Sequence, residues 1–179
     1  MQKVILIFGL IAGVIVSVFM VIIMGMCESG TINLDTSDFI GYGSMVIALS
    51  MIFFGVKSFR DNYQNGAIKF GKALQVGMLI TVVASLIYAI AGETYYQIDP
   101  ESQMAMMDKY ADHHINKMKE KGALPAEIDQ KAKEMADLKE MSKSPVIRFA
   151  ITLFLILPVG ILITVISAAL LRKKEFLPA

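Results

Sequence analysis

The chain has 179 residues, of which 55% are hydrophobic and 18% are charged, and its formal net charge is +1. Soluble domains carry about 25% charged residues, so this composition argues against an ordinary soluble domain. A net charge so close to zero provides no broad basic surface, and we therefore expect no nucleic-acid partner. The single cysteine, Cys27, excludes an intrachain disulfide.

Four long apolar stretches without any acidic residue dominate the sequence. They comprise residues 4–26, 39–56, 73–91 and 146–171. Each is close to the ~20 residues that an α-helix needs to cross about 30 Å of hydrocarbon. The first is longer than the apolar region of a signal peptide, so we expect it to be retained. The sequence therefore predicts an all-α membrane protein built on a four-helix transmembrane bundle.

The distribution of basic residues predicts which side of the membrane each connection faces. The connection 57–72 carries four bases and one acid, and the tail carries Arg172, Lys173 and Lys174, whereas the connection between the first two spans has three acids and no base. Cytoplasmic connections carry the excess of Lys and Arg. We therefore expect a multi-pass protein of the inner (cytoplasmic) membrane with both termini in the cytoplasm. The eight lysines of the third connection, about 92–144, oppose this orientation.

Aromatic residues alternate with the bases of the 57–72 connection, which contains Phe59, Tyr63 and Phe70. This mixture suits a loop in the headgroup layer, where rings insert between lipids and cations contact phosphates. The positive-inside bias alone also accounts for the bases. Both interpretations stay open. The candidate contacts with anionic lipid are Lys57, Arg60, Lys69 and Lys72.

Small residues recur along the first span, where Gly9, Gly13 and Ser17 are spaced four apart. Such a ridge lets two helix backbones approach closely in lipid. Packing within the bundle is the favoured interpretation, and a dimer seam is the alternative. In the fourth span, Pro158 and Gly160 predict a kink. Their sequence neighbours are apolar, which favours a structural kink over a transport site.

Residues 93–144 separate the first three spans (1–92) from the fourth span and the tail (145–179). Asp99 followed by proline predicts a helix start, and Gly122 predicts its end. A second helix starts at Pro125. Apolar residues recur every three or four positions on both helices. We predict an extracytoplasmic antiparallel hairpin whose apolar faces pack first on each other, and otherwise on the membrane or a partner. The two stripes are Met104, Met107, Ala111, Ile115 and Met118, and Ile128, Ala132, Met135, Leu138 and Met141.

The interiors of the predicted spans contain hydroxyl groups but no acid, histidine or internal base. Proton and ion pathways need such groups at membrane depth, and a hydrolase needs a nucleophile with a base or a metal. We therefore expect no catalytic residue, no cofactor, no metal site and no enzymatic activity. His113 and His114 point about 100° apart on a helix, so they cannot chelate one ion from a single face. Asp108 with Asp112 would form only a weak site.

Several runs of residues resemble a known family. They are Phe53 to Asn62, Asn65-Gly66, Phe70 to Leu74, Leu157 to Gly160 and Leu170 to Lys174. Together they look like the signature of the family called domain of unknown function 4199, and the likeness extends over almost the whole chain. The resemblance implies a small bacterial inner-membrane protein. The family has no established activity, cofactor or catalytic residue, so the resemblance assigns none here.

These observations favour a non-enzymatic membrane component, namely an accessory, scaffold or partner-binding protein. The apolar interior and the amphipathic hairpin are the reasons. The expected partners are the lipid bilayer and a protein, or a second copy of the chain, bound through the spans or the hairpin. The alternative is a subunit of a transporter or channel, which would have to oligomerise to line a pore. A lipid-modifying enzyme using the basic connection is a weaker third interpretation.

Overall fold

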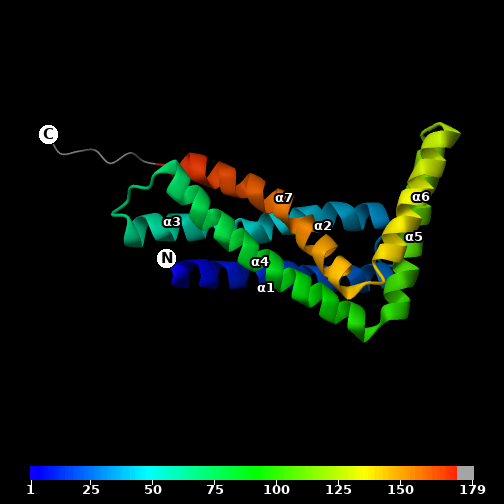
Figure 1. Cartoon of the computed structure of the whole chain (residues 1–179), viewed down its shortest axis with the longest axis horizontal. Coiled ribbons are helices and arrows are strands. Elements are labelled where there is room, and N and C mark those ends of the chain that lie inside the picture. The colour runs from blue at the N-terminus through cyan, green and yellow to red at the C-terminus, as the bar shows by residue number, and fades with distance from the viewer. Residues whose placement is uncertain (173–179) are drawn as a thin grey trace.

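The computed structural model describes residues 1–172 and is helical with short connections over this range (Figure 1). The tail bases Lys173 and Lys174, which the orientation argument uses, lie outside the described residues. Over the described range the helices are α1 (Gln2–Glu28), α2 (Leu34–Leu49), α3 (Met51–Tyr63), α4 (Phe70–Ile98), α5 (Pro100–Glu120), α6 (Pro125–Met141) and α7 (Pro145–Leu171).

Four helical segments of the described chain are long and apolar enough to cross a membrane, which confirms the four predicted spans. They are Gln2–Glu28, Leu34–Tyr63, Phe70–Ile98 and Pro145–Leu171. The spans lie alongside one another, and α5 and α6 stand together across one end of them (Figure 1). At the opposite end α1 begins and α7 finishes. The protein is therefore all-helical, with the architecture of a multi-pass membrane protein.

The second span differs from the single uninterrupted helix that its apolar stretch suggested. It is divided into α2 and α3 at Ser50. The Ser50 hydroxyl donates a 2.6 Å hydrogen bond to the carbonyl of Ile47, one turn earlier. Hydroxyl groups that bond back in this way compete with the regular helical pattern and bend helices. A local side-chain contact therefore accompanies the interruption.

Local capping residues account for the ends of several helices. The Asn33 side chain accepts a 2.8 Å hydrogen bond from the Thr36 amide at the start of α2. Asp99 does the same for the amide of Ser102 at the start of α5, at 3.0 Å. Gly122 adopts φ +72° just after α5, a left-handed conformation that glycine reaches without strain. These boundaries follow from side chains a few residues apart, and the start and end of α5 agree with those predicted from Asp99 and Gly122.

Helix α4 lies at the centre of the bundle, with its most extensive contacts to α7 and α1. Its buried apolar residues, Ile80 and Ala84 among them, join one core with residues of α1, α2, α3 and α7. The ridge of α1 faces this helix. A Cβ atom added at Gly9 would lie 2.6 Å from Cβ of Val83, and one added at Gly13 would lie 2.7 Å from Cβ of Ile87. The ridge thus lies at an interface within the chain.

Pro158 lies inside α7, and the helix continues past it. Although its sequence neighbours are apolar, the structure brings a polar side chain beside this segment from α4. The Thr81 hydroxyl lies 3.1 Å from that of Thr164 and donates to the Gly77 carbonyl at 3.0 Å. A Cβ atom at Gly160 would overlap with the Thr81 methyl group. Gly160 therefore permits close packing of α7 on α4.

Candidate functional site

A cavity of about 710 Å³ lies between the α5–α6 pair and the adjoining ends of α1 and α7. This volume falls within the roughly 300–1,000 Å³ of small-molecule sites. Most of the lining is apolar, and four methionines contribute to it. They are Met24, Met106, Met107 and Met135. The residue types and the volume fit a flexible apolar ligand better than a compact polar one.

The apolar stripes of α5 and α6 do not bury themselves against each other. Met106 is the buried residue of α5, and over its described length α6 has none. Met107, Ala111 and Ile115 of the predicted α5 stripe are half-buried and line the cavity. Met106 lies outside that stripe, and the sequence analysis did not identify it as a buried residue. The apolar stripe marks the face of α5 that packs on one neighbouring helix and does not show that a second face of α5 is also covered. The helix pair therefore borders a cavity that its own residues leave open.

An ion pair links α5 to α6 beside the cavity. The Lys139 ammonium donates a 2.5 Å hydrogen bond to Asp108, and both residues contribute to the lining. Asp108 thus forms an ion pair with Lys139. From the sequence, the one role considered for Asp108 was a weak metal site together with Asp112. The pair adds polar character to the α5–α6 side of a largely apolar cavity.

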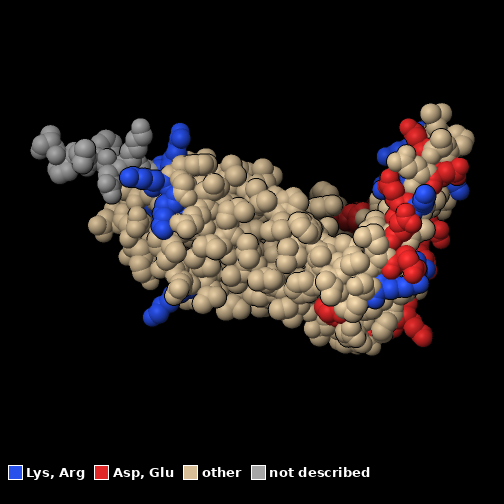
Figure 2. All heavy atoms as spheres, viewed as in Figure 1, with Lys and Arg blue, Asp and Glu red and all other residues tan. Residues whose placement is uncertain are grey.

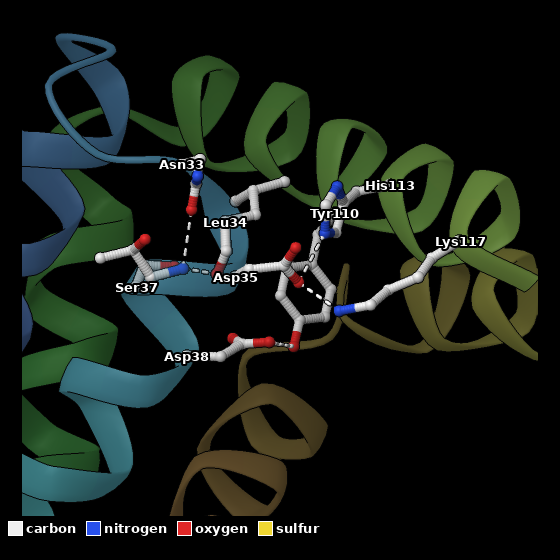
Figure 3. Close-up of polar contacts among 9 residues, drawn as sticks. Asn33, Leu34, Asp35, Ser37, Asp38, Tyr110, His113 and Lys117 are labelled. Atoms are coloured by element: carbon white, nitrogen blue, oxygen red, sulfur yellow. Dashed lines mark hydrogen bonds and ion pairs between the residues drawn. The ribbon is translucent and has the colours of Figure 1, made fainter. Parts of the chain in front are cut away.

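Two acidic residues at the start of α2 hold α5 on the bundle (Figure 3). The Tyr110 hydroxyl donates to Asp38 at 3.2 Å, and Nε2 of His113 lies 3.0 Å from Asp35. Lys117 also donates to Asp35. Tyr110, His113 and Lys117 are three and four residues apart, which places them on one helical face. That spacing on one face of the helix was a signal of this contact in the sequence.

The contact between α5 and α2 shifts the pKa of two groups on α5. Burial of the ring raises the pKa of Tyr110 to about 12, with the negative charge of Asp38 as a further cause. The hydrogen bond to Asp35 raises the pKa of Lys117 above its usual value. The folded state therefore favours a neutral phenol and a protonated amine at these positions. The neutral phenol of Tyr110 and the protonated amine of Lys117 are the forms that donate the hydrogen bonds from α5 to α2.

A second polar contact ties the α4–α5 junction to the end of α1. The Glu28 carboxylate accepts hydrogen bonds from Tyr95, Ser102 and Gln103 at 3.4, 3.3 and 3.2 Å. Gln103 also lines the cavity. Glu28 is one of the three acids of the connection between the first two spans, and in the sequence it indicated only on which side of the membrane that connection lies. The structure places it where it joins α1, α4 and α5.

Arg148 forms the third contact and joins α7 to α4. Its guanidinium donates to Glu93 at 2.8 and 2.5 Å and to the Ser142 carbonyl at 2.7 Å. It also lies 3.6 Å from the centre of the Tyr96 ring. Such a fork-shaped ion pair gives both energy and orientation. The sequence showed Arg148 at the start of the last apolar stretch but did not reveal its partner, which lies 55 residues away in the chain.

The candidate lipid contacts lie at the other end of the bundle, on the connection between α3 and α4 and the adjoining turns. Figure 2 shows Lys and Arg gathered at that end and mixed charges around α5 and α6. Arg60 donates to Asp61 at 2.7 Å, and Lys72 donates to Gln75 at 3.0 Å. Lys57 and Lys69 are exposed.

One aromatic ring at this end does not behave as the lipid interpretation assumed. Phe59 is only 3% exposed and belongs to the core. Its ring stacks on that of Tyr63 at 5.6 Å. Insertion of Phe59 between lipids was therefore a wrong expectation, because the residue lies on the inward face of α3. Tyr63 and Phe70 remain exposed.

A protein family matches nearly the whole chain. Its family model covers residues 7–173, which include most of the first span and all of α2 to α7. No match is found among curated proteins or among solved structures. The chain therefore belongs to the family described as protein of unknown function (DUF4199).

Proposed function

We propose that this protein is a non-enzymatic membrane component that binds another molecule at the α5–α6 end of its bundle. The observation that carries the proposal is the cavity of about 710 Å³ between the helix pair and the bundle. Its mostly apolar lining with a few polar groups is typical of a binding site. The role is that of an accessory, scaffold or partner-binding protein.

The contacts around the cavity support binding over catalysis. Polar side chains near it are engaged with one another, as in the Lys139–Asp108 pair and the Arg148–Glu93 pair. These pairs hold helices together and shape the cavity. In the bundle, the hydroxyls of Thr81 and Ser85 bond to backbone carbonyls one turn earlier. These groups serve packing, so the binding role is favoured over the alternative of a transporter or channel subunit.

The proposal includes an orientation in an inner (cytoplasmic) membrane. Both termini and the α3–α4 connection face the cytoplasm, and α5 with α6 forms an extracytoplasmic antiparallel hairpin. The bases at the end of the bundle away from α5 and α6 support this orientation (Figure 2). The binding cavity then opens at the outer side of the membrane.

Photo-crosslinking from within the cavity tests the proposal. A benzophenone amino acid replaces Ala132, which lines the cavity, and in a matched variant it replaces the exposed neighbour Lys133. Adjacent helical residues point about 100° apart, so the two probes sample different surroundings. We expect a discrete adduct at position 132 only, lost when Ala136→Phe fills the cavity. Identical adducts at both positions, or an adduct unaffected by Ala136→Phe, would contradict the proposal.

A further inference from the structure

We infer that the cavity takes an acyl chain of a bilayer phospholipid from the leaflet at the α5–α6 end. The inference rests on the proposed function, because it names the ligand class for the same site. The occupant is a lipid of the surrounding membrane, held with one chain between the helix pair and α7. It follows from where the cavity opens, from its depth and from its lining.

The cavity is continuous with the surface that α7 presents to lipid. Ile151 and Leu155 line it, and both lie within the fourth span. Ile151 and Leu155 are also 37% and 48% exposed. The same two residues therefore border both the cavity and the hydrocarbon. A lipid chain beside α7 can enter the cavity without leaving apolar surroundings.

The polar cluster at Arg148 gives the depth of this opening. Arginine and tyrosine favour the membrane–water boundary, and Arg148 lies against Glu93 and Tyr96. Leu155 comes seven residues later on the same helix, which at 1.5 Å per residue is about 10 Å further into the bilayer. The α7 side of the cavity is therefore at hydrocarbon depth. Its α5–α6 side carries the Asp108–Lys139 pair, so the cavity is amphipathic in the same sense as a phospholipid.

The lining suits a chain of variable shape. Methionine side chains are flexible and polarisable, and they adapt to ligands of different curvature. Met106 and Met107 contribute them from α5, and Met135 from α6. Ala132 and Ala136 on α6 take up little space beside them. An acyl chain needs contact without directional hydrogen bonds, which is what these residues provide.

The chain contains no tryptophan, so a single introduced tryptophan reports on its own surroundings. Met135→Trp places the reporter in the cavity, on a helix of the pair. Ile151→Trp is the positive control, because it borders lipid with or without an occupied cavity. Lys133→Trp is the negative control on the exposed side of α6. Each variant is reconstituted into vesicles of phosphatidylcholine, either unmodified or carrying bromine atoms on the acyl chains.

We expect brominated chains to remove most of the fluorescence of Met135→Trp and of Ile151→Trp, and to leave Lys133→Trp unchanged. Met107→Trp, which reports from α5, should be quenched in the same way and serves where Met135→Trp alters folding. If Ile151→Trp is quenched and both cavity reporters keep their fluorescence, the lipid inference is wrong. A protein adduct from position 132 in that case would leave the proposed function standing with a different occupant. Absence of any adduct as well would overturn both.

Discussion

Arg148 and Glu93 connect the ends of two spans through a fork of hydrogen bonds at 2.8 and 2.5 Å. The side chains are 11% and 23% exposed, so solvent screens them only in part. The third guanidinium nitrogen donates to the backbone carbonyl of Ser142, and Ser142 also lines the cavity. This single arginine therefore fixes α7 against α4 and against the segment that follows α6. A lysine retains the charge but has no fork of donors.

We predict that Arg148→Lys lowers the free energy of unfolding by about 2 kcal/mol, the scale of one lost hydrogen bond between charged groups. Titration with a denaturing detergent, followed by circular dichroism in mild micelles, measures this. The control is Lys143→Gln, which breaks the exposed pair with Glu140. Exposed pairs contribute about 0–1 kcal/mol, so the control should stay close to the parent protein. Equal stability of Arg148→Lys and the control would contradict the prediction.

Tyr110 gives a pH-dependent prediction at the same scale. Its pKa is raised from 10.0 to about 12, first by burial and then by Asp38. An unfolded chain ionises tyrosine near its ordinary value, while the folded protein retains the proton. The contribution of this contact to stability is therefore fully present below pH 10.0 and is lost as the pH rises toward about 12.

The ultraviolet absorbance of tyrosinate measures this pKa directly. The titration of the parent protein minus that of Tyr110→Phe should show one phenol ionising near pH 12. In an Asp38→Asn background the same difference should move toward the ordinary tyrosine value, because one cause of the shift is removed. A difference curve already centred at the ordinary value in the parent protein would refute the assignment.

Close packing between α1 and α4 depends on two glycines of the ridge. A Cβ atom at Gly13 would lie 2.7 Å from Cβ of Ile87 and 3.1 Å from the Ala84 carbonyl oxygen. Both atoms belong to the rigid part of a central helix and cannot move aside easily. Further along α1, a Cβ at Gly25 would meet nothing within 4 Å. One helix thus carries a constrained and an unconstrained glycine.

We predict that Gly13→Ala lowers the free energy of unfolding by roughly 1–3 kcal/mol through overpacking. Gly25→Ala makes the same chemical change in the same helix and should leave stability unchanged or raise it slightly. The same detergent titration compares the two variants. Equal losses for the two variants, or a larger loss for Gly25→Ala, would contradict the prediction.

Local and long-range signals had different outcomes for α5 and α6. The capping residue Asp99 and the turn residue Gly122 act within a few residues, and the helix boundaries predicted from them match the structure. The neighbours of Met106 and His113 depend on how far the pair is rotated on the bundle. The apolar stripe of a helix does not determine that rotation when the helix can pack on two neighbours, here the other helix of the pair and the bundle. The binding cavity therefore could not be predicted, although six of its lining residues belong to the two predicted stripes, namely Met107, Ala111, Ile115, Ala132, Met135 and Leu138.

The whole molecule is electrically asymmetric along its long axis (Figure 2). The connection 57–72 between α3 and α4 carries four bases and one acid, Asp61, whereas the other end combines acids with the lysines of α5 and α6. Short basic connections favour the cytoplasm. The lysines of residues 93–144 favour the opposite orientation. An experiment can therefore distinguish two orientations, one with α5 and α6 outside the cytoplasm and one with both helices inside it.

We predict that the α5–α6 pair faces away from the cytoplasm. In a Cys27→Ala background, Lys133→Cys and Asn65→Cys each supply a single exposed thiol. A membrane-impermeant maleimide added to right-side-out vesicles should label Lys133→Cys at once and Asn65→Cys only after permeabilisation. The reverse pattern would place the helix pair in the cytoplasm and would show that the lysines near the fourth span dominate the orientation.

The sequence by itself determined the four apolar spans, the boundaries of α5, the start of α6 and the family of the chain. Hydropathy, capping residues and motif runs act along the chain, and a helix in lipid must satisfy its own backbone hydrogen bonds, so local composition is decisive. Only the tertiary structure decided that Arg148 meets Glu93, 55 residues away, and that His113 meets Asp35, 78 residues away. It also opened the cavity between the helix pair and α7. Those contacts depend on the rotation and crossing of helices, which similar apolar faces leave undetermined until all the helices are packed together.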